Sequence, residues 1–208
     1  MSNPTPGFFY FDLGCVLLEF DHETAVEQLA NLGPLSTDRV REIVFESELQ
    51  QSYERGEIDT ATFCDIFRAR AGVSQSDAAI CKAASNIFSP NHRVVELVEQ
   101  MHRAHLPLGL LSNTCEAHWD WILNQGNSFL QHLDPKILSF QVRASKPTPR
   151  IYEKAIAEVR LPAQQIFFVD DLSENVAGAK ALGMDAVLYT TADDLRDALL
   201  KRGVNLPA

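Results

Sequence analysis

The feature that most constrains this chain is a run of four aromatic residues, Phe8 to Phe11, that ends abruptly at Asp12. A short run that is apolar at every position is typical of a strand buried on both faces, in the middle of a parallel sheet covered by helices. Asp12 then stands at the carboxyl end of such a strand, where open α/β sheets bind their ligands. A single strand-end aspartate is more often a turn residue, so its role depends on the other strand ends.

From about residue 89 the sequence alternates between apolar runs and helical segments. Further strands are predicted at Pro107–Ser112, Ile137–Phe140, Ile166–Asp170 and Ala186–Tyr189. Ser89-Pro90 is predicted to cap and open the first helix of this part, and Thr148-Pro149 a later one. Alternation of this kind requires right-handed crossovers and a parallel, doubly wound sheet. The predicted fold class is therefore α/β.

The segment before residue 89 has a different pattern. It shows helical periodicity with helix stops and no convincing strand. Helices are predicted at His22–Leu32, Thr37–Glu54 in one or two pieces, Thr60–Ala71 and Gln75–Ile87. Asp59 is a predicted N-cap, and Ser74 with Asp77 is similar to a capping box. The sequence thus predicts a helical insert of roughly seventy residues, enough for a small bundle.

Composition restricts the partners. Twenty-eight acidic against eighteen basic residues give a net charge of -10, which argues against a nucleic acid or an anionic membrane. No apolar run reaches the length of a membrane span, and residues 1–7 lack the pattern of a signal peptide. The four cysteines show no framework spacing, so we expect reduced thiols and a cytoplasmic protein.

Polar residues with complementary chemical roles follow the predicted strands. They are Asp12 after the first, Ser112-Asn113 after the second, Lys146 beyond the third, and Asp170-Asp171 after the fourth. A phosphoryl group needs a nucleophile, cationic neutralisation and hydrogen-bond donors. Carboxylates at two strand ends repel unless a cation lies between them, and hard oxygen ligands suit Mg²⁺. Lys146 supplies a point charge, and Pro147 disfavours a helix there. The ordered set indicates phosphoryl-group chemistry.

With these motifs the chain resembles the haloacid dehalogenase superfamily of phosphohydrolases. Phe11 to Gly14 is similar to its first motif, Ser112-Asn113 to the second, Lys146-Pro147 to the third, and Asp170-Asp171 with Asn175 to the fourth. The resemblance implies a Rossmann-like core, residues 1–19 and 89–208, whose first strand lies between the second and the fourth. It also implies a helical cap, residues 20–88. The chain looks most like bacterial sugar-phosphate phosphatases of the α-D-glucose-1-phosphate type, which share the Asp-Leu-Gly start and the Arg-Ile-Tyr at Arg150 to Tyr152.

The resemblance also implies an activity: Mg²⁺-dependent hydrolysis of a small phosphorylated metabolite, such as a sugar phosphate, through an aspartyl-phosphate. In that scheme Asp12 is the nucleophile and Lys146 the second catalytic residue. Ser112, Asn113 and Lys146 hold the phosphate. The metal ligands are Asp12, the Gly14 carbonyl, Asp170 and Asp171, and which of the last two binds directly stays open. The partner is a small phosphoester; a monomer is compatible with the sequence, which leaves the oligomeric state open.

Gly14 is a departure from the family pattern. Most phosphatases of this superfamily have a second aspartate two residues after the nucleophile, as general acid and base, which is typically worth ~10²–10⁴-fold. Without it, we expect sugar 1-phosphates, with their more acidic leaving hydroxyl, to outperform 6-phosphates. A proton from Asp21 or His22 at the start of the cap would weaken that preference. Two alternatives stay open: a phosphometabolite-binding protein with little turnover, and a 2-haloacid dehalogenase, although dehalogenases lack the metal-binding acidic pair.

Overall fold

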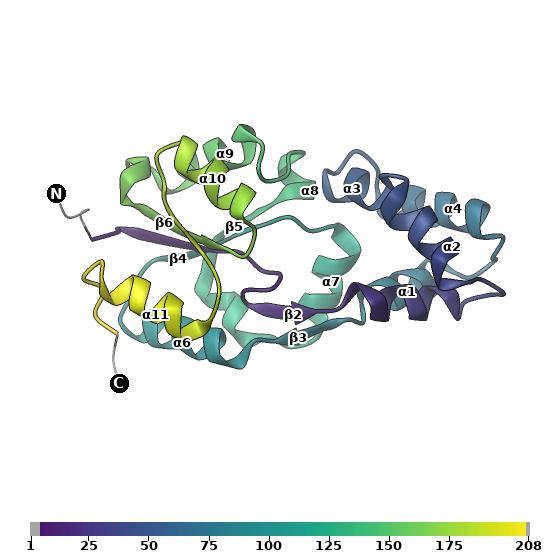
Figure 1. Ribbon diagram of the computed structural model, residues 1–208, viewed down its shortest axis with the longest axis horizontal. Coiled ribbons are helices and arrows are strands. Elements are labelled where there is room, and N and C mark those ends of the chain that lie inside the picture. Colours follow the sequence, from purple (N-terminus) through teal and green to yellow (C-terminus); the bar gives the residue numbers. More distant parts are fainter. Residues whose placement is uncertain (1–4, 207–208) are drawn as a thin grey trace.

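The computed structural model describes residues 5–206, and Figure 1 shows their arrangement. The core is a five-stranded parallel sheet in the order β5-β4-β1-β6-β7. Its strands are Phe8–Phe11 (β1), Leu108–Ser112 (β4), Leu133–Leu138 (β5), Ile166–Asp170 (β6) and Asp185–Leu188 (β7). The first strand lies between the second and the fourth predicted strands, and the predicted α/β class is confirmed. Residues 1–4 and 207–208 of the predicted core lie outside the described residues.

Helices cover both faces of this sheet (Figure 1). On one face lie α6 (His92–Arg103), α7 (Glu116–Asn124), the 3₁₀ turn Ser128–His132 and α11 (Ala192–Leu200); on the other lie α9 (Pro149–Val159) and α10 (Ser173–Ala181), with a 3₁₀ turn at Ala163–Gln165 before β6. The aromatic run of β1 serves both layers: Phe9 and Phe11 pack with the first group, Phe8 and Tyr10 with the second. The buried Tyr10 hydroxyl donates to the Ala155 carbonyl at 3.0 Å. Burial on both sides explains why the run has no alternation.

The predicted insert folds as helices that pack on one another, beyond the carboxyl ends of the strands (Figure 1). They are α1 (His22–Ala30), α2 (Thr37–Arg41), a π-helical stretch (Glu42–Glu46), α3 (Leu49–Glu54), α4 (Thr60–Ala71) and α5 (Asp77–Ser85). Asp59 is the N-cap of α4, as predicted, and accepts from the Thr62 N–H at 2.8 Å. The predicted capping box is wrong, because Ser76 and not Ser74 caps α5. The domain boundaries at residues 20 and 88 stay predictions.

Two short strands join the insert to the core. Leu18–Phe20 (β2) pairs antiparallel with Phe88–Pro90 (β3). Ser89-Pro90 is therefore in a strand, and the prediction that it opens a helix is wrong: α6 begins at His92. The third predicted strand was also misplaced, since Leu138 ends β5 and Ser139–Val142 forms the short helix α8. None of the helices within residues 5–206 is both long and apolar enough to cross a membrane.

Candidate active site

Asp12 follows β1 directly and lies at the carboxyl edge of the sheet. Its backbone N–H donates to the Val169 carbonyl at 3.0 Å, which extends the pairing of β1 with β6 by one residue. The side chain is nearly buried: Oδ1 accepts from the Leu13 N–H at 2.7 Å and lies 2.8 Å from Lys146 Nζ. Both contacts use Oδ1, which leaves Oδ2 as the oxygen available to a ligand.

Lys146 is the centre of a buried charge network. Its Nζ lies 2.8 Å from Asp12 Oδ1 and 2.6 Å from Asp170 Oδ2, and it donates to the Leu111 carbonyl at 3.0 Å. An ammonium group has three hydrogens, so these three acceptors engage all of them. Burial would by itself lower the pKa of Lys146, but the two carboxylates outweigh it, and the net pKa is raised. Lys146 stays charged; its direct contact with phosphate stays a prediction.

Asn113 positions the loop that carries Lys146. Its Nδ2 donates to the Lys146 carbonyl at 3.0 Å, and its Oδ1 accepts from the Lys146 N–H at 2.8 Å. The neighbouring Thr114 is held in the same way, since Ser139 Oγ accepts from its N–H and donates to its carbonyl, both at 2.9 Å. Ser112, itself buried, lines the cavity in front of the strand ends. Phosphate binding by Ser112 and Asn113 stays a prediction, and the Asn113 amide has a positioning role that the sequence did not indicate.

Asp170 and Asp171 form a cluster of carboxylates with Asp12, in which one oxygen from each lies within 4.8 Å of the others. Asp170 is fully buried, and its Oδ1 accepts from the Leu172 N–H at 2.8 Å and from Asn175 Nδ2 at 2.9 Å. Asp171 is only partly buried. Three carboxylates against one ammonium leave an excess of two negative charges. Such a site favours a cation, and an all-oxygen donor set suits Mg²⁺.

Burial and the neighbouring negative charges raise the pKa values of Asp12 and Asp171. Burial raises the pKa of Asp12 to about 7, because the attraction of Lys146 does not offset it and Asp170 adds to the rise. Burial, and then the charge on Asp170, raises the pKa of Asp171. A nearby cation favours the ionised form of both groups. The three carboxylates therefore fit Mg²⁺; that Asp12, Asp170, Asp171 and the Gly14 carbonyl bind it stays a prediction.

The space beside Gly14 is filled by an aromatic ring. A Cβ atom built on Gly14 would lie 2.7 Å from Cε1 of Phe20 and 3.4 Å from its Cδ1. The Phe20 ring therefore occupies the direction in which a second aspartate would extend. A Gly14→Asp substitution requires Phe20 to move first.

A cavity of about 60 Å³ lies in front of the strand ends. Core residues that line it are Leu13, Gly14, Ser112, Asn113, Thr114 and His118, and residues of the predicted cap are Phe20, His22, Glu54, Ile87 and Phe88. Of the two proton donors suggested from the sequence, His22 lines this cavity. Asp21 is instead the exposed N-cap of α1, where its carboxylate accepts from the Glu23 N–H at 2.9 Å and from Thr24 Oγ1 at 3.1 Å. The structure thus gives Asp21 a structural role.

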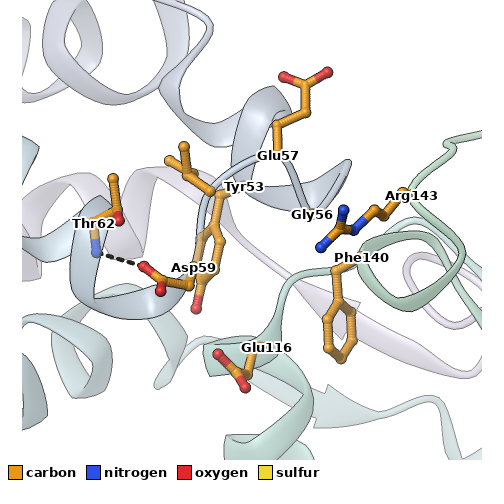
Figure 2. A pocket seen from close by; sticks show the side chains of 9 residues that line it. Tyr53, Gly56, Glu57, Asp59, Thr62, Glu116, Phe140 and Arg143 are labelled. Carbon is orange, nitrogen blue, oxygen red and sulfur yellow. Dashed lines mark hydrogen bonds between the residues drawn. The ribbon is translucent and has the colours of Figure 1, made fainter.

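A larger cavity of about 440 Å³ lies between the turn after α3 and the starts of α7 and α8 (Figure 2). Its lining residues are Tyr53, Gly56, Glu57, Ile58, Asp59, Thr62, Glu116, Phe140 and Arg143. Figure 2 shows the Asp59 carboxylate turned towards the Thr62 N–H, as an N-cap, rather than towards a ligand. Asp12, Lys146 and Asp170 do not line this cavity. These three residues do not line the smaller cavity either, but Leu13 and Asn113, which hydrogen-bond to Asp12 and to the Lys146 backbone, do line it. We therefore place the chemistry at the smaller cavity.

The chain that carries this arrangement matches a known family over most of its length. A family model described as haloacid dehalogenase-like hydrolase matches residues 16–183. The chain belongs to the haloacid dehalogenase-like hydrolase family. The resemblance inferred from the four motifs is thereby confirmed.

Individual members of the family are similar along most of the chain. The D-ribitol-5-phosphate phosphatase of Bacteroides thetaiotaomicron is 24% identical over 91% of this chain and 94% of that protein. A sesquiterpene phosphatase of Aspergillus oryzae is 26% identical over 84% of this chain and 85% of its own. The solved structure of a B. thetaiotaomicron family enzyme with magnesium and inorganic phosphate superposes with a TM-score of 0.77 at 24% identity, covering 89% of this chain and 94% of that one. The likeness of the structures confirms the fold.

The family match confirms the predicted hydrolase of the haloacid dehalogenase type. The relatives named as phosphatases and the related structure with magnesium agree with the predicted phosphoric monoester hydrolase and with Mg²⁺. Sequence reasoning missed five cavity residues: Phe20, Glu54, Ile87, Phe88 and His118. Each reaches the cavity only through tertiary packing, and none stands in a motif. The sequence feature near Glu54 that indicated a close contact was Gly56, because a glycine at a helix end often marks a positive φ or a close backbone approach.

Proposed function

We propose that this enzyme is a Mg²⁺-dependent phosphatase that hydrolyses a small phosphorylated sugar or polyol through an aspartyl-phosphate on Asp12. The observation that carries the proposal is the buried ion pair between Asp12 and Lys146, 2.8 Å apart, beside the carboxylates of Asp170 and Asp171. A nucleophile fixed at one oxygen by a lysine, next to a cation-binding cluster, suits attack on a phosphoryl group.

In the proposed reaction Oδ2 of Asp12 attacks phosphorus, and the bond from phosphorus to the ester oxygen breaks. Lys146 holds Oδ1 in place and offsets the charge on Asp12 and Asp170. Ser112 is buried and lines the cavity; its hydroxyl donates to the Asn113 carbonyl at 3.2 Å here, and in the proposed reaction it donates to the transferring oxygens instead. Bound Mg²⁺ supplies the positive charge that the phosphate and the three aspartates require. Water then hydrolyses the aspartyl-phosphate, which regenerates Asp12.

The cavity supports a small substrate. Its volume of about 60 Å³ is far below the ~300–1,000 Å³ of pockets for drug-sized ligands. Phe20, Ile87 and Phe88 give it apolar surface, whereas His22, Glu54 and His118 offer hydrogen bonds. This mixture suits a short chain of carbons and hydroxyls. The relative named for D-ribitol 5-phosphate supports the same substrate class.

A panel of phosphoesters tests the proposal. Phosphate release is measured from sugar 1-phosphates, sugar 6-phosphates, ribitol 5-phosphate and 4-nitrophenyl phosphate, in Mg²⁺ and in EDTA. We expect release only in Mg²⁺, and none from Asp12→Asn, which keeps the side-chain size but removes the charge of the nucleophile. A thermal melt of this variant checks that it is folded. Full activity in EDTA or in Asp12→Asn contradicts the mechanism; bound ester without product indicates a binding protein, and halide release from a 2-haloacid indicates a dehalogenase.

A further inference from the structure

The leaving group of a phosphate ester needs a proton, and the first motif of this chain has no side chain to donate it. Gly14 stands where a second aspartate is expected, and the Phe20 ring lies 2.7 Å from the Cβ position of any replacement. A donor must therefore reach the cavity from another element.

Three titratable side chains line the cavity away from the strand ends: His22, Glu54 and His118. The two histidines are packed against aromatic rings, His22 edge-on to Phe20 with centroids 4.9 Å apart and His118 edge-on to Phe88 at 5.2 Å. Burial lowers the pKa of both, in His118 to about 4. Both imidazoles are therefore neutral near pH 7, and a neutral imidazole is a very weak acid.

Glu54 has the properties of an acid. It ends α3, is partly exposed, and lines the same cavity as Gly14 and Ser112. Its Oε1 accepts from Nε2 of the buried Gln50 at 2.9 Å, and within residues 5–206 its Oε2 makes no hydrogen bond. Burial raises the pKa of Glu54, which increases the fraction that carries a proton at neutral pH.

The turn that carries Glu54 is fixed against the core. Two residues further on, Gly56 lies at φ +63, and a Cβ built there would be 2.1 Å from the Phe140 carbonyl oxygen, so the backbones are in close contact. Tyr53, one residue before Glu54, accepts from the Ala117 N–H at 2.9 Å through its hydroxyl. Figure 2 shows Gly56 next to Phe140, whose ring points away from the turn, and the Tyr53 side chain extending towards Glu116 at the start of α7. Contacts on both sides thus hold Glu54 at the cavity.

We propose that Glu54 is the general acid of this enzyme: it protonates the leaving oxygen from the side of the predicted cap, the function that an aspartate in place of Gly14 would serve. The inference rests on the proposed phosphatase function. As Asp12 bonds to phosphorus, the phosphorus–oxygen ester bond breaks, and the leaving oxygen takes the Glu54 proton. The Glu54 carboxylate then takes a proton from the water whose oxygen attacks the aspartyl-phosphate. Alcohol and inorganic phosphate are released, and both carboxyl groups return to their starting states.

Leaving-group dependence tests the role of Glu54. Glu54→Gln keeps the shape and an acceptor for Gln50 but has no proton to donate. For the sugar 6-phosphate or polyol phosphate hydrolysed fastest in the panel, we expect turnover to fall ~10²–10⁴-fold. For 4-nitrophenyl phosphate, which leaves as a stabilised phenolate, we expect a fall of less than about tenfold. The preference for sugar 1-phosphates over 6-phosphates should be weak in the wild type and marked in the variant.

Two further variants exclude a merely structural effect. Glu46→Gln changes an exposed glutamate of the same insert and should leave turnover of both ester types unchanged. Glu54→Asp keeps the acid but withdraws it by one methylene, so it should give a smaller fall with the same leaving-group dependence. If Glu54→Gln does not fold, Glu54→Asp carries the test.

The pH profile provides an independent readout. Turnover of the alkyl ester, the sugar 6-phosphate or polyol phosphate of the panel, should fall as the pH rises through the pKa of Glu54. This fall in turnover should be absent with 4-nitrophenyl phosphate and in Glu54→Gln. The titratable and charged groups near Glu54 are Arg55, Lys146, Cys115, His22 and His118. Arg55 and Lys146 oppose the rise in its pKa, so burial sets its direction.

The possible outcomes separate the two proposals. Equal losses on both ester types, or none on the alkyl ester, overturn the role of Glu54 and leave the proposed function intact. No hydrolysis of any ester by the wild type overturns the proposed function and the inference with it.

Discussion

The two walls of the active-site cavity are held in different ways. Directly behind the core wall, Lys146 binds Asp170 and Asp12 through ion pairs of 2.6 and 2.8 Å, and Asn113 of that wall fixes the Lys146 backbone. On the cap wall, Phe20 and His22 are held by aromatic packing and Glu54 by one amide hydrogen bond. A substitution in the charge network of the core leaves a buried charge without a partner. A substitution on the cap wall instead alters the shape of the cavity and the supply of a proton to the leaving group.

This difference predicts which wall tolerates substitution. Buried charges are strongly coupled, so removing one member costs several kcal/mol. Packed aromatic and aliphatic side chains tolerate exchange at lower cost if the volume is kept. The core wall is therefore suited to a fixed reaction and the cap wall to a variable substrate.

Lys146→Met gives the largest expected effect on the core wall. Sequence reasoning, which places Lys146 in a loop facing phosphate, predicts a loss of turnover by orders of magnitude and a thermal stability that changes little or rises. The ion pairs with Asp12 and Asp170 predict a loss of about 3–5 kcal/mol in the free energy of unfolding as well, because two carboxylates then face each other without the ammonium. Denaturant unfolding in EDTA measures it. Lys180→Met, on the exposed face of α10, is the control, and equal stability of the two variants contradicts the prediction.

A pair of glycine variants tests the cap wall. Gly56 and Gly72 both lie at positive φ, +63 and +68, but only Gly56 has backbone within 4 Å of its Cβ position. Gly72→Ala should cost only the ~1–2 kcal/mol of a left-handed alanine. Gly56→Ala should also push the turn away from Phe140 and displace Glu54. A displacement of about 1 Å in a catalytic group lowers turnover by about 10²-fold.

Turnover of the alkyl ester is compared with thermal stability in both variants. A fall in turnover that merely follows the loss of stability, equal in Gly56→Ala and Gly72→Ala, means that the contact with Phe140 does not position the cap wall.

The smallest expected effect is a shift in melting temperature with pH. The pKa of Asp12 is raised from 3.8 to about 7 in the absence of metal. A carboxyl whose pKa is higher in the folded chain contributes stability at low pH, and that contribution is lost as the pH rises through about 7. Mg²⁺ binds the ionised form, so it should raise the melting temperature more at about pH 8 than at about pH 5. Melting curves in EDTA and in Mg²⁺ measure the difference; an equal rise at both values contradicts it.

Local patterns predicted the core wall well. The strand ends at Asp12 and Asp170 agree with the structure to the residue, and so does one helix of the insert, from Thr60 to Ala71. In each case the information is local: an apolar run stopped by a polar residue, or an N-cap followed by helical periodicity. Because parallel strands end at one edge, placing those ends in order also placed the charges close together.

The predictions that were wrong concern residues whose structure depends on contacts with residues far away in the sequence. β2 and β3 have three residues each, and they are strands only because they pair with each other across the whole insert. β5 was misplaced because Pro135 argues against a strand, yet the missing N–H is tolerated where β5 forms the sheet edge. Glu54 could not be assigned a role for the same reason, since the helix that carries it meets the core only in the folded chain.

The β2–β3 pair has a consequence for how this architecture can change. Leu18 pairs with Pro90, so the chain leaves the sheet and re-enters it at neighbouring positions. The Asn91 N–H also donates to the Leu17 carbonyl at 3.0 Å, which makes the two crossings adjacent on the core side. The segment between them therefore behaves as a loop whose ends are already closed, and the entropy of loop closure grows only slowly with its length. We therefore expect that exchanging residues 21–87 for a shorter or longer segment leaves the strand order of the core unchanged. Such an exchange replaces His22, Glu54 and Ile87, which line the cavity.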